Sequence, residues 1–160
     1  MMTLAEENII GGEIVSTMES GSILSIFYDT YSMGWTFGFK IFYYLINHYN
    51  SLGVIHNYSL PVPRLISRAI FASKPDLIET LKRRKLLIVD IFGSKYNIHP
   101  NEDYVIPITN PTEETLVPKI EKINKERIHP LAKTGNIVRL IYTVDGSVAL
   151  FGGEVPTLKT

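Results

Sequence analysis

Apolar residues along the chain gather in short uninterrupted runs, separated by stretches with a more polar, helix-forming pattern. The clearest runs are Ser22–Tyr28, Gly53–Asn57 and Leu86–Phe92. Apolar runs of this length are typical of strands that are buried on both faces, as in the centre of a parallel sheet. We therefore predict strands at these three places, with a shorter strand at Tyr104–Ile108.

Helices are predicted between these strands. Residues 35–48 are apolar on nearly every side, which suits a helix buried between other elements. Three more helices are expected at residues 64–71, 75–84 and 112–133, the last of them bent at Pro118. Strands that alternate with helices indicate an α/β fold of three layers, α/β/α, around a mostly parallel sheet.

The C-terminal part of the sequence predicts one departure from parallel pairing. Residues 136–144 and 147–151 are both β-like, and Asp145 and Gly146 lie between them. An Asp-Gly pair is a common two-residue hairpin turn. We therefore expect an antiparallel hairpin at one edge of the sheet. Residues 1–160 are predicted to form one domain, which could continue beyond the last residue.

Composition narrows the classes of function. A hydrophobic fraction of 45% fits a folded globular protein, and a net charge of zero argues against a general nucleic-acid or membrane-surface binder. The sequence has no cysteine, which excludes disulfides, thiolate zinc sites and thiol nucleophiles. The N-terminus lacks the cationic start of a signal peptide, and the apolar stretch at residues 35–46 is too short to cross a bilayer. We expect a cytoplasmic protein.

The turn after the first predicted strand has the register of a phosphate-binding loop. Such a loop reads G-x-x-x-x-G-K-[ST] between a strand and a helix, so that backbone N–H groups, the lysine and a metal-bound hydroxyl surround the phosphates. The second glycine is present as Gly34 and the hydroxyl as Thr36. Asp29 replaces the first glycine and Trp35 replaces the lysine.

Both replacements oppose phosphate binding. The carboxylate of Asp29 repels phosphate oxygens, and Trp35 replaces a positive charge with a large ring. The second half of such a site is an acid at the end of a strand, and the run that begins at Leu86 ends at Asp90 in that way. If Mg-nucleotide binds at all, Thr36 and Asp90 are the expected metal ligands.

This order of motifs resembles the RecA/KaiC-type P-loop ATPases, and more closely a family from Pyrococcus and related hyperthermophilic archaea that has degenerate nucleotide motifs. The likeness runs from about Gly21 to Phe151. RecA/KaiC-like proteins use a loop lysine and threonine, a strand-end aspartate and a glutamate after the second strand. The resemblance carries over only to Thr36 and Asp90, since no glutamate follows the second strand here.

Three functions follow from these patterns. The first is a non-catalytic P-loop-like domain without a cofactor, which binds a protein or peptide or acts as a regulatory module. The resemblance also implies self-association into a homo-oligomer. The second is a residual ATPase that binds Mg-ATP through Thr36 and Asp90. The third is a DNA-associated factor that uses the basic run Lys82–Lys85, although neutral net charge favours a simpler reading of that run as a helix end with favourable cations.

Overall fold

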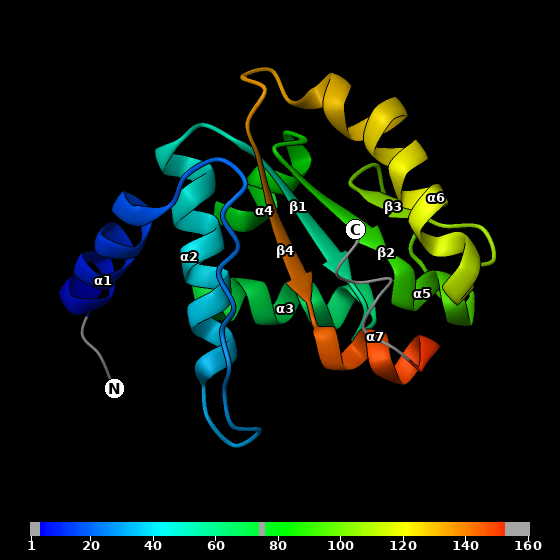
Figure 1. The fold of residues 1–160 in the computed structure, drawn as a ribbon, viewed down its shortest axis with the longest axis horizontal. Coiled ribbons are helices and arrows are strands. Elements are labelled where there is room, and N and C mark those ends of the chain that lie inside the picture. Colours follow the sequence, from blue (N-terminus) through cyan, green and yellow to red (C-terminus); the bar gives the residue numbers. More distant parts are fainter. Residues whose placement is uncertain (1–3, 74–75, 153–160) are drawn as a thin grey trace.

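The computed structural model describes residues 4–73 and 76–152. Figure 1 shows the order and arrangement of its elements. The helices are α1 (Leu4–Thr17), α2 (Gly34–His48), α3 (Val62–Ser73), α4 (Asp76–Lys82), α5 (Ile91–Tyr96), α6 (Glu113–Ile123) and α7 (Val144–Phe151). A π-helical turn, η1 (Asn124–Ile128), and a 3-10 turn, η2 (His129–Leu131), continue α6. The strands are β1 (Leu52–Asn57), β2 (Leu86–Asp90), β3 (Val105–Pro107) and β4 (Ile137–Tyr142).

The four strands form one parallel sheet in the order β3-β2-β1-β4. Four of the predicted strands are confirmed as β1, β2, β3 and β4, and every residue of β1 and β2 is buried. Continuous burial explains why these strands read as uninterrupted apolar runs. β2 is shorter than predicted because Asp90 at its end caps α5, which begins one residue later.

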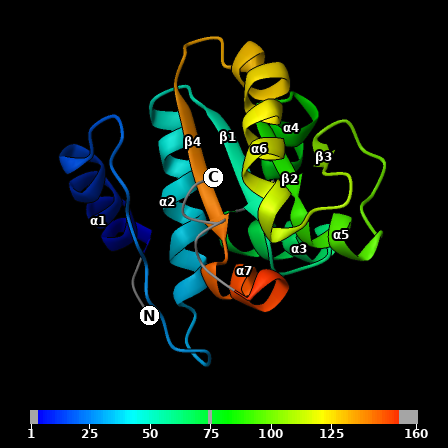
Figure 2. The same ribbon diagram turned by 45° about the vertical axis from the view of Figure 1, so that its right-hand side comes forward.

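Two apolar clusters hold the helices to the two faces of the sheet. On one face α2, α3 and α4 pack against residues such as Ile55 and Ile88. On the other face α6 and η1 pack against residues such as Val54 and Leu87. Figures 1 and 2 show these helices on opposite sides of the strands, with α1 outside α2. The predicted α/β class and three-layer α/β/α arrangement are confirmed.

The predicted antiparallel edge is wrong, because residues 144–151 form α7 instead of a second hairpin strand. Thr143 caps this helix, and its hydroxyl accepts a hydrogen bond from the N–H of Gly146 at 3.1 Å. Asp145 and Gly146 therefore lie in the first turn of a helix. An acid in that turn is favoured by the helix dipole, so the Asp-Gly pair fits a helix start as well as a hairpin.

The predicted strand at Ser22–Tyr28 is also wrong, because this segment is extended but pairs with no described strand. It packs on α2 instead: Ile26 lies against Gly38 and Tyr28 lies against Gly34. Its other large side chains face outward, and Phe27 is 94% exposed. Only some of the apolar side chains in this segment thus pack against the rest of the protein.

Of the described helices, α2, α3, α4 and α6 were predicted, whereas α1, α5 and α7 were not. α2, α3 and α6 with its two extra turns occupy the predicted places, and Pro118 lies inside α6. α4 accounts for most of the predicted helix at 75–84, whose first residue lies outside the described part of the chain. The first two residues of α5, Ile91 and Phe92, were predicted to be the end of a strand. None of the described helices has the length and apolar character that a membrane crossing requires.

Candidate functional site

The carboxyl ends of the strands are where α/β proteins usually bind ligands, at the point where the strand order reverses. That point lies between β1 and β4, because the chain moves from β1 outward through β2 to β3 and returns to the other side of β1. The side chains at the ends of β1, β2 and β4 are therefore the first candidates for a site.

Asp90 at the end of β2 is fully buried and serves the fold. Its Oδ1 accepts hydrogen bonds from Asn57 Nδ2 at 2.9 Å and from the N–H of Gly93 at 3.0 Å. Burial raises the pKa of Asp90, and these two hydrogen bonds partly offset that effect. Its Oδ2 is buried without a partner among the described residues. The carboxylate is thus turned into the protein and caps α5.

The crevice expected between β1 and β4 is closed. Ser59 Oγ lies 2.8 Å from Thr143 Oγ1, and the same oxygen accepts the N–H of Thr143 at 3.0 Å. Gly146 approaches so closely that a Cβ atom there would lie 2.2 Å from Ser59 Oγ and 2.8 Å from the carbonyl oxygen of Tyr58. The start of α7 therefore fills the place where a nucleotide would enter.

The residues of the predicted phosphate loop form an exposed turn before α2. Asp29 Oδ1 accepts the N–H of Tyr31 at 2.8 Å, and the Thr36 hydroxyl donates to the carbonyl of Met33 at 2.6 Å. Gly34 leaves room for Tyr28, whose Cβ would lie 2.3 Å from a Cβ at position 34. Each group thus has a local partner.

No contact between described residues joins Thr36 to Asp90. No group of three His, Asp or Glu side chains within the described part of the chain is placed to hold a metal ion. These residues remain the predicted ligands of a nucleotide only under the ATPase hypothesis.

Trp35 belongs to an aromatic cluster on the α2–α3 side of the sheet. Its ring centroid lies 5.9 Å from that of Phe71 and 6.3 Å from that of Phe39. The guanidinium of Arg68 lies over the Trp35 ring at 5.1 Å and donates a hydrogen bond to Tyr142 Oη at 2.8 Å. The Trp35 ring is therefore used in packing.

The outer edge of β4 has no partner strand in the described chain. Leu52 donates to the carbonyl of Asn136 at 3.0 Å and Tyr58 donates to that of Tyr142 at 2.7 Å, so the even-numbered residues of β4 face β1. In a parallel ladder the alternate residues point their backbone groups the other way. The N–H and C=O groups of residues 137, 139 and 141 therefore point outward, and none of them bonds to another described segment.

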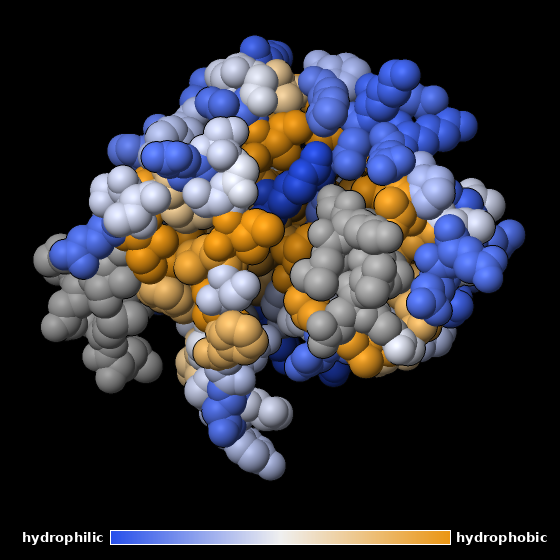
Figure 3. Space-filling model, in the orientation of Figure 1, coloured by the Kyte–Doolittle hydropathy of each residue, from blue (hydrophilic) through white to orange (hydrophobic). Residues whose placement is uncertain are grey.

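The side chains of β4 are only half covered, unlike those of the central strands. Residues 137–141 are all of intermediate exposure, and only Tyr142 is buried. No described helix lies in front of β4 in Figure 1, because α6 is displaced toward β2 and β3. Figure 3 shows apolar side chains gathered around the course of β4 on this face, beside a hollow. We call the row of outward backbone groups and these half-covered side chains the β4 edge.

One charged side chain, Arg139, lies in the β4 edge. Its Nη1 lies 3.1 Å from Nε2 of His56, a fully buried residue of β1. Burial, together with the nearby guanidinium, lowers the pKa of His56 to about 3, so the ring is neutral at ordinary pH. Burial also lowers the pKa of Arg139. The guanidinium is thus a partly desolvated cation beside a neutral ring.

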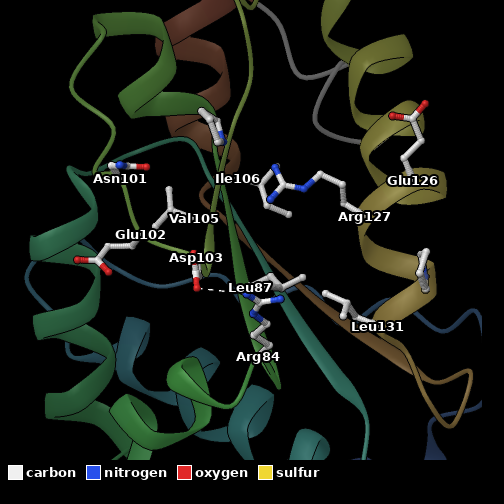
Figure 4. A pocket seen from close by; sticks show the side chains of 12 residues that line it. Arg84, Leu87, Asn101, Glu102, Asp103, Val105, Ile106, Glu126, Arg127 and Leu131 are labelled. Atoms are coloured by element: carbon white, nitrogen blue, oxygen red, sulfur yellow. Dashed lines mark hydrogen bonds and ion pairs between the residues drawn. The ribbon is translucent and has the colours of Figure 1, made fainter.

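A separate pocket of about 460 Å³ lies between β3 and the turns that follow α6. Figure 4 shows Arg127 and Leu131 pointing into it from one wall, opposite an ion pair between Arg84 and Asp103 at 3.2 Å. Its lining includes Leu87 of β2 and all three residues of β3. It contains no residue of the predicted phosphate loop and not Asp90, although Arg84 of the basic run lines it.

Comparisons with known proteins give one structural neighbour that can be described here. No protein-family model matches the sequence, and no curated protein matches it significantly. The chain is similar to a crystal structure of an uncharacterized protein from Pyrococcus horikoshii in complex with an unknown peptide, with a TM-score of 0.62 and 25% identity. The match covers 82% of this chain and 54% of the other, so the chain spans about half the length of that protein.

Sequence reasoning did not single out the β4 edge. Arg139 is the only charged residue in an otherwise apolar β-like run, IVRLIY. A lone cation in such a run is the signal that could have pointed to it, because a central strand rarely carries one.

Proposed function

We propose that this chain is a peptide-binding module that takes up an extended peptide along the β4 edge. The observation that carries the proposal is the unpaired row of backbone N–H and C=O groups at residues 137, 139 and 141. A peptide that lies beside this row adds a fifth strand to the sheet, as in other cases of strand addition. The Pyrococcus horikoshii structure, which holds an unknown peptide, supports a protein of this class.

The side chains of β4 suit the same task. Val138 and Leu140 lie at the margin of the cluster on the α2 face, and Ile137 and Ile141 at the margin of the cluster on the α6 face. All four remain partly exposed, so a peptide strand can bury apolar side chains against either face. Backbone hydrogen bonds then supply affinity, and alternate side chains supply selectivity.

This proposal agrees with a domain of RecA/KaiC-like descent that has lost nucleotide chemistry, which we keep as the proposed class. The closed crevice at Ser59 and Thr143 and the packing of Trp35 support the loss of that chemistry. Pairing of the β4 edges of two copies is an alternative use of the same surface, and it would account for a homo-oligomer.

Backbone hydrogen exchange tests the proposal. The protein is used to select binders from a display library of random nine-residue peptides, and amide exchange is measured by NMR with the best binder. We expect the amides of residues 137, 139 and 141 to become protected, since they acquire partners. The amides of Val138 and Leu140 serve as an internal control, because the ladder with β1 already protects them.

Two results of the peptide selection would overturn the proposal. One is the absence of any selected peptide at micromolar affinity, with the protein shown to be folded and monomeric. The other is a binder that protects amides elsewhere and leaves the three outward amides of β4 unchanged. Protection of those amides that rises with protein concentration and without peptide would assign the edge to a second copy of the chain and would also contradict peptide binding.

A further inference from the structure

Arg139 has a positive charge for which the described residues offer no counter-ion. The ion pairs found in the described chain join Arg83 to Glu79 and Arg84 to Asp103, and neither involves Arg139. Its side chain is half-buried in the β4 edge. A cation that is partly removed from water is costly unless an anion compensates it. This part of the edge is therefore unbalanced in charge.

His56 cannot supply that compensation. A guanidinium can only donate, so Nε2 of His56 must accept from Arg139 and the proton of the neutral ring must be on Nδ1. This Nδ1 is buried and has no partner among the described residues. A neutral ring orients the guanidinium without cancelling its charge. His56 is therefore a positioning residue for Arg139.

We propose that the peptide bound at the β4 edge carries a carboxylate, which pairs with Arg139. This inference rests on the proposed function, and it names the chemistry of the ligand at the same site. A carboxylate provides two acceptors for the fork of guanidinium donors, the strongest neutralising partner that a peptide offers. The carboxylate can belong to an Asp or Glu side chain or to the end of the peptide.

The register of β4 also predicts the neighbours of that acid. Ile137 and Ile141 lie two residues before and after Arg139, so all three side chains point to the same face of the sheet. Both isoleucines pack at the margin of the apolar cluster under α6. A peptide strand in register therefore places apolar residues opposite them and the acid opposite Arg139. The expected pattern is apolar, any, acid, any, apolar.

Library selection with matched variants tests the inference. Random nine-residue peptides are presented in two formats, with a free or an amidated C-terminus, to the wild-type chain and to Arg139→Gln and Arg139→Lys. Lys133→Gln is the control, since it removes a positive charge from an exposed residue just before β4. We expect the wild type and the control to select the pattern above, and Arg139→Gln to lose the selection for the acid.

A selected peptide and its Glu→Gln partner then give a quantitative measure. The wild type should bind the acidic peptide about tenfold more tightly, because a bidentate charge-assisted pair is lost in the other. Arg139→Gln should bind both equally, and Arg139→Lys should retain part of the preference. Should Arg139→Gln fail to fold, the wild type alone suffices: its preference for the acidic peptide should disappear below a pH of about 4, where the peptide carboxyl is protonated.

The outcomes separate this inference from the proposed function. If no peptide protects the outward amides of β4, both are wrong. If peptides bind at β4 without enrichment of an acid, or if Arg139→Gln selects acids as strongly as the wild type, only the inference is wrong. Acid selection that depends on Arg139 supports it. Selection in the free format alone, lost on amidation, assigns the carboxylate to the end of the peptide.

Discussion

β2 and β4 belong to the same sheet and have similar sequences, LLIVD and IVRLIY, yet they differ in what surrounds them. β2 has a partner strand on each side and every one of its residues is buried. β4 has one partner, and five of its six residues are only half covered. The comparison shows that one type of apolar strand is fully covered at the centre of a sheet and only half covered at its edge.

The polar residues of the two strands differ in the same way. Asp90 of β2 is turned inward and bonded to Asn57 and to the start of α5. Arg139 of β4 points its charge into a half-covered surface and has a neutral ring as its partner. An edge strand is normally protected against pairing by charges or by a covering segment. Arg139 can therefore restrict this edge to partners that bring an acid.

The largest effect, on the free energy of unfolding, is expected from a substitution at the end of the central strand β2. Asp90→Ala should lower the free energy of unfolding by about 2 kcal/mol, because it removes a helix cap and leaves buried donors without an acceptor. Asp90→Asn should cost far less, because its amide oxygen can accept the same two hydrogen bonds. Urea unfolding at pH 7 measures both. An equal decrease in the free energy of unfolding in the two variants would show that the hydrogen bonds of Asp90 do not account for its contribution to stability.

The pH dependence of Asp90 gives a second readout for the same pair. Burial raises the pKa of Asp90 in the folded state. The contribution of Asp90 to the free energy of unfolding is therefore fully present below the pKa of the unfolded state, and it is lost as the pH rises through the pKa of the folded state. Asp90→Asn has no such loss. Its stability relative to the wild type should therefore increase from pH 4 to pH 8. A constant difference across that range would contradict a raised pKa.

A smaller effect is expected from blocking the edge strand. Ile141→Pro removes one outward N–H of the β4 edge, and proline is tolerated on edge strands. Its affinity for a selected peptide should fall by about tenfold relative to Ile141→Ala, because the peptide loses one ladder hydrogen bond that alanine retains. Isothermal titration calorimetry measures both variants, and circular dichroism confirms that they are folded. Equal affinities would mean that the peptide does not use this row.

The strands at the centre of the sheet could be predicted for a physical reason. A strand buried on both faces must be apolar throughout, so β1 and β2 are visible as runs of residues. Ser22–Tyr28 is similarly apolar. Whether such a segment joins a sheet, however, depends on whether another strand has an unpaired edge beside it, and the local sequence pattern does not show this. The Asp145-Gly146 pair likewise fits a hairpin or a helix start, and the contact of Gly146 with Tyr58 decides between them.

The candidate site was harder to predict because its defining property is the absence of a partner. No residue type is characteristic of an unpaired backbone edge. The sequence of β4 offers only one unusual feature, the charged residue Arg139 in an apolar run. The loop at Asp29–Thr36 was easier to notice, since it has the register of a known motif. In the structure Gly34 is explained by the close approach of Tyr28, and the Thr36 hydroxyl by a bond to Met33. Partial matches to a motif can thus have ordinary packing causes.

The smallest expected effect concerns nucleotide binding at that loop. Trp35 is the only tryptophan, and it lies in contact with Phe71, Phe39 and Arg68 beside the predicted phosphate loop. Titration with Mg-ATP and Mg-ADP should leave its fluorescence unchanged up to millimolar nucleotide. Arg68→Ala is the positive control, because it removes the cation over the ring and should change the emission without nucleotide.

A saturable change in Trp35 fluorescence at micromolar nucleotide, weakened in Asp90→Asn, would contradict this prediction. It would require Asp90 to leave Asn57 and α5 and to reach a metal ion, so that the buried strand end becomes the functional site. A flat titration in a protein whose Trp35 emission does respond to Arg68→Ala has the opposite meaning. In that case the predicted loop binds no nucleotide, and Asp90 at the end of β2 serves the fold.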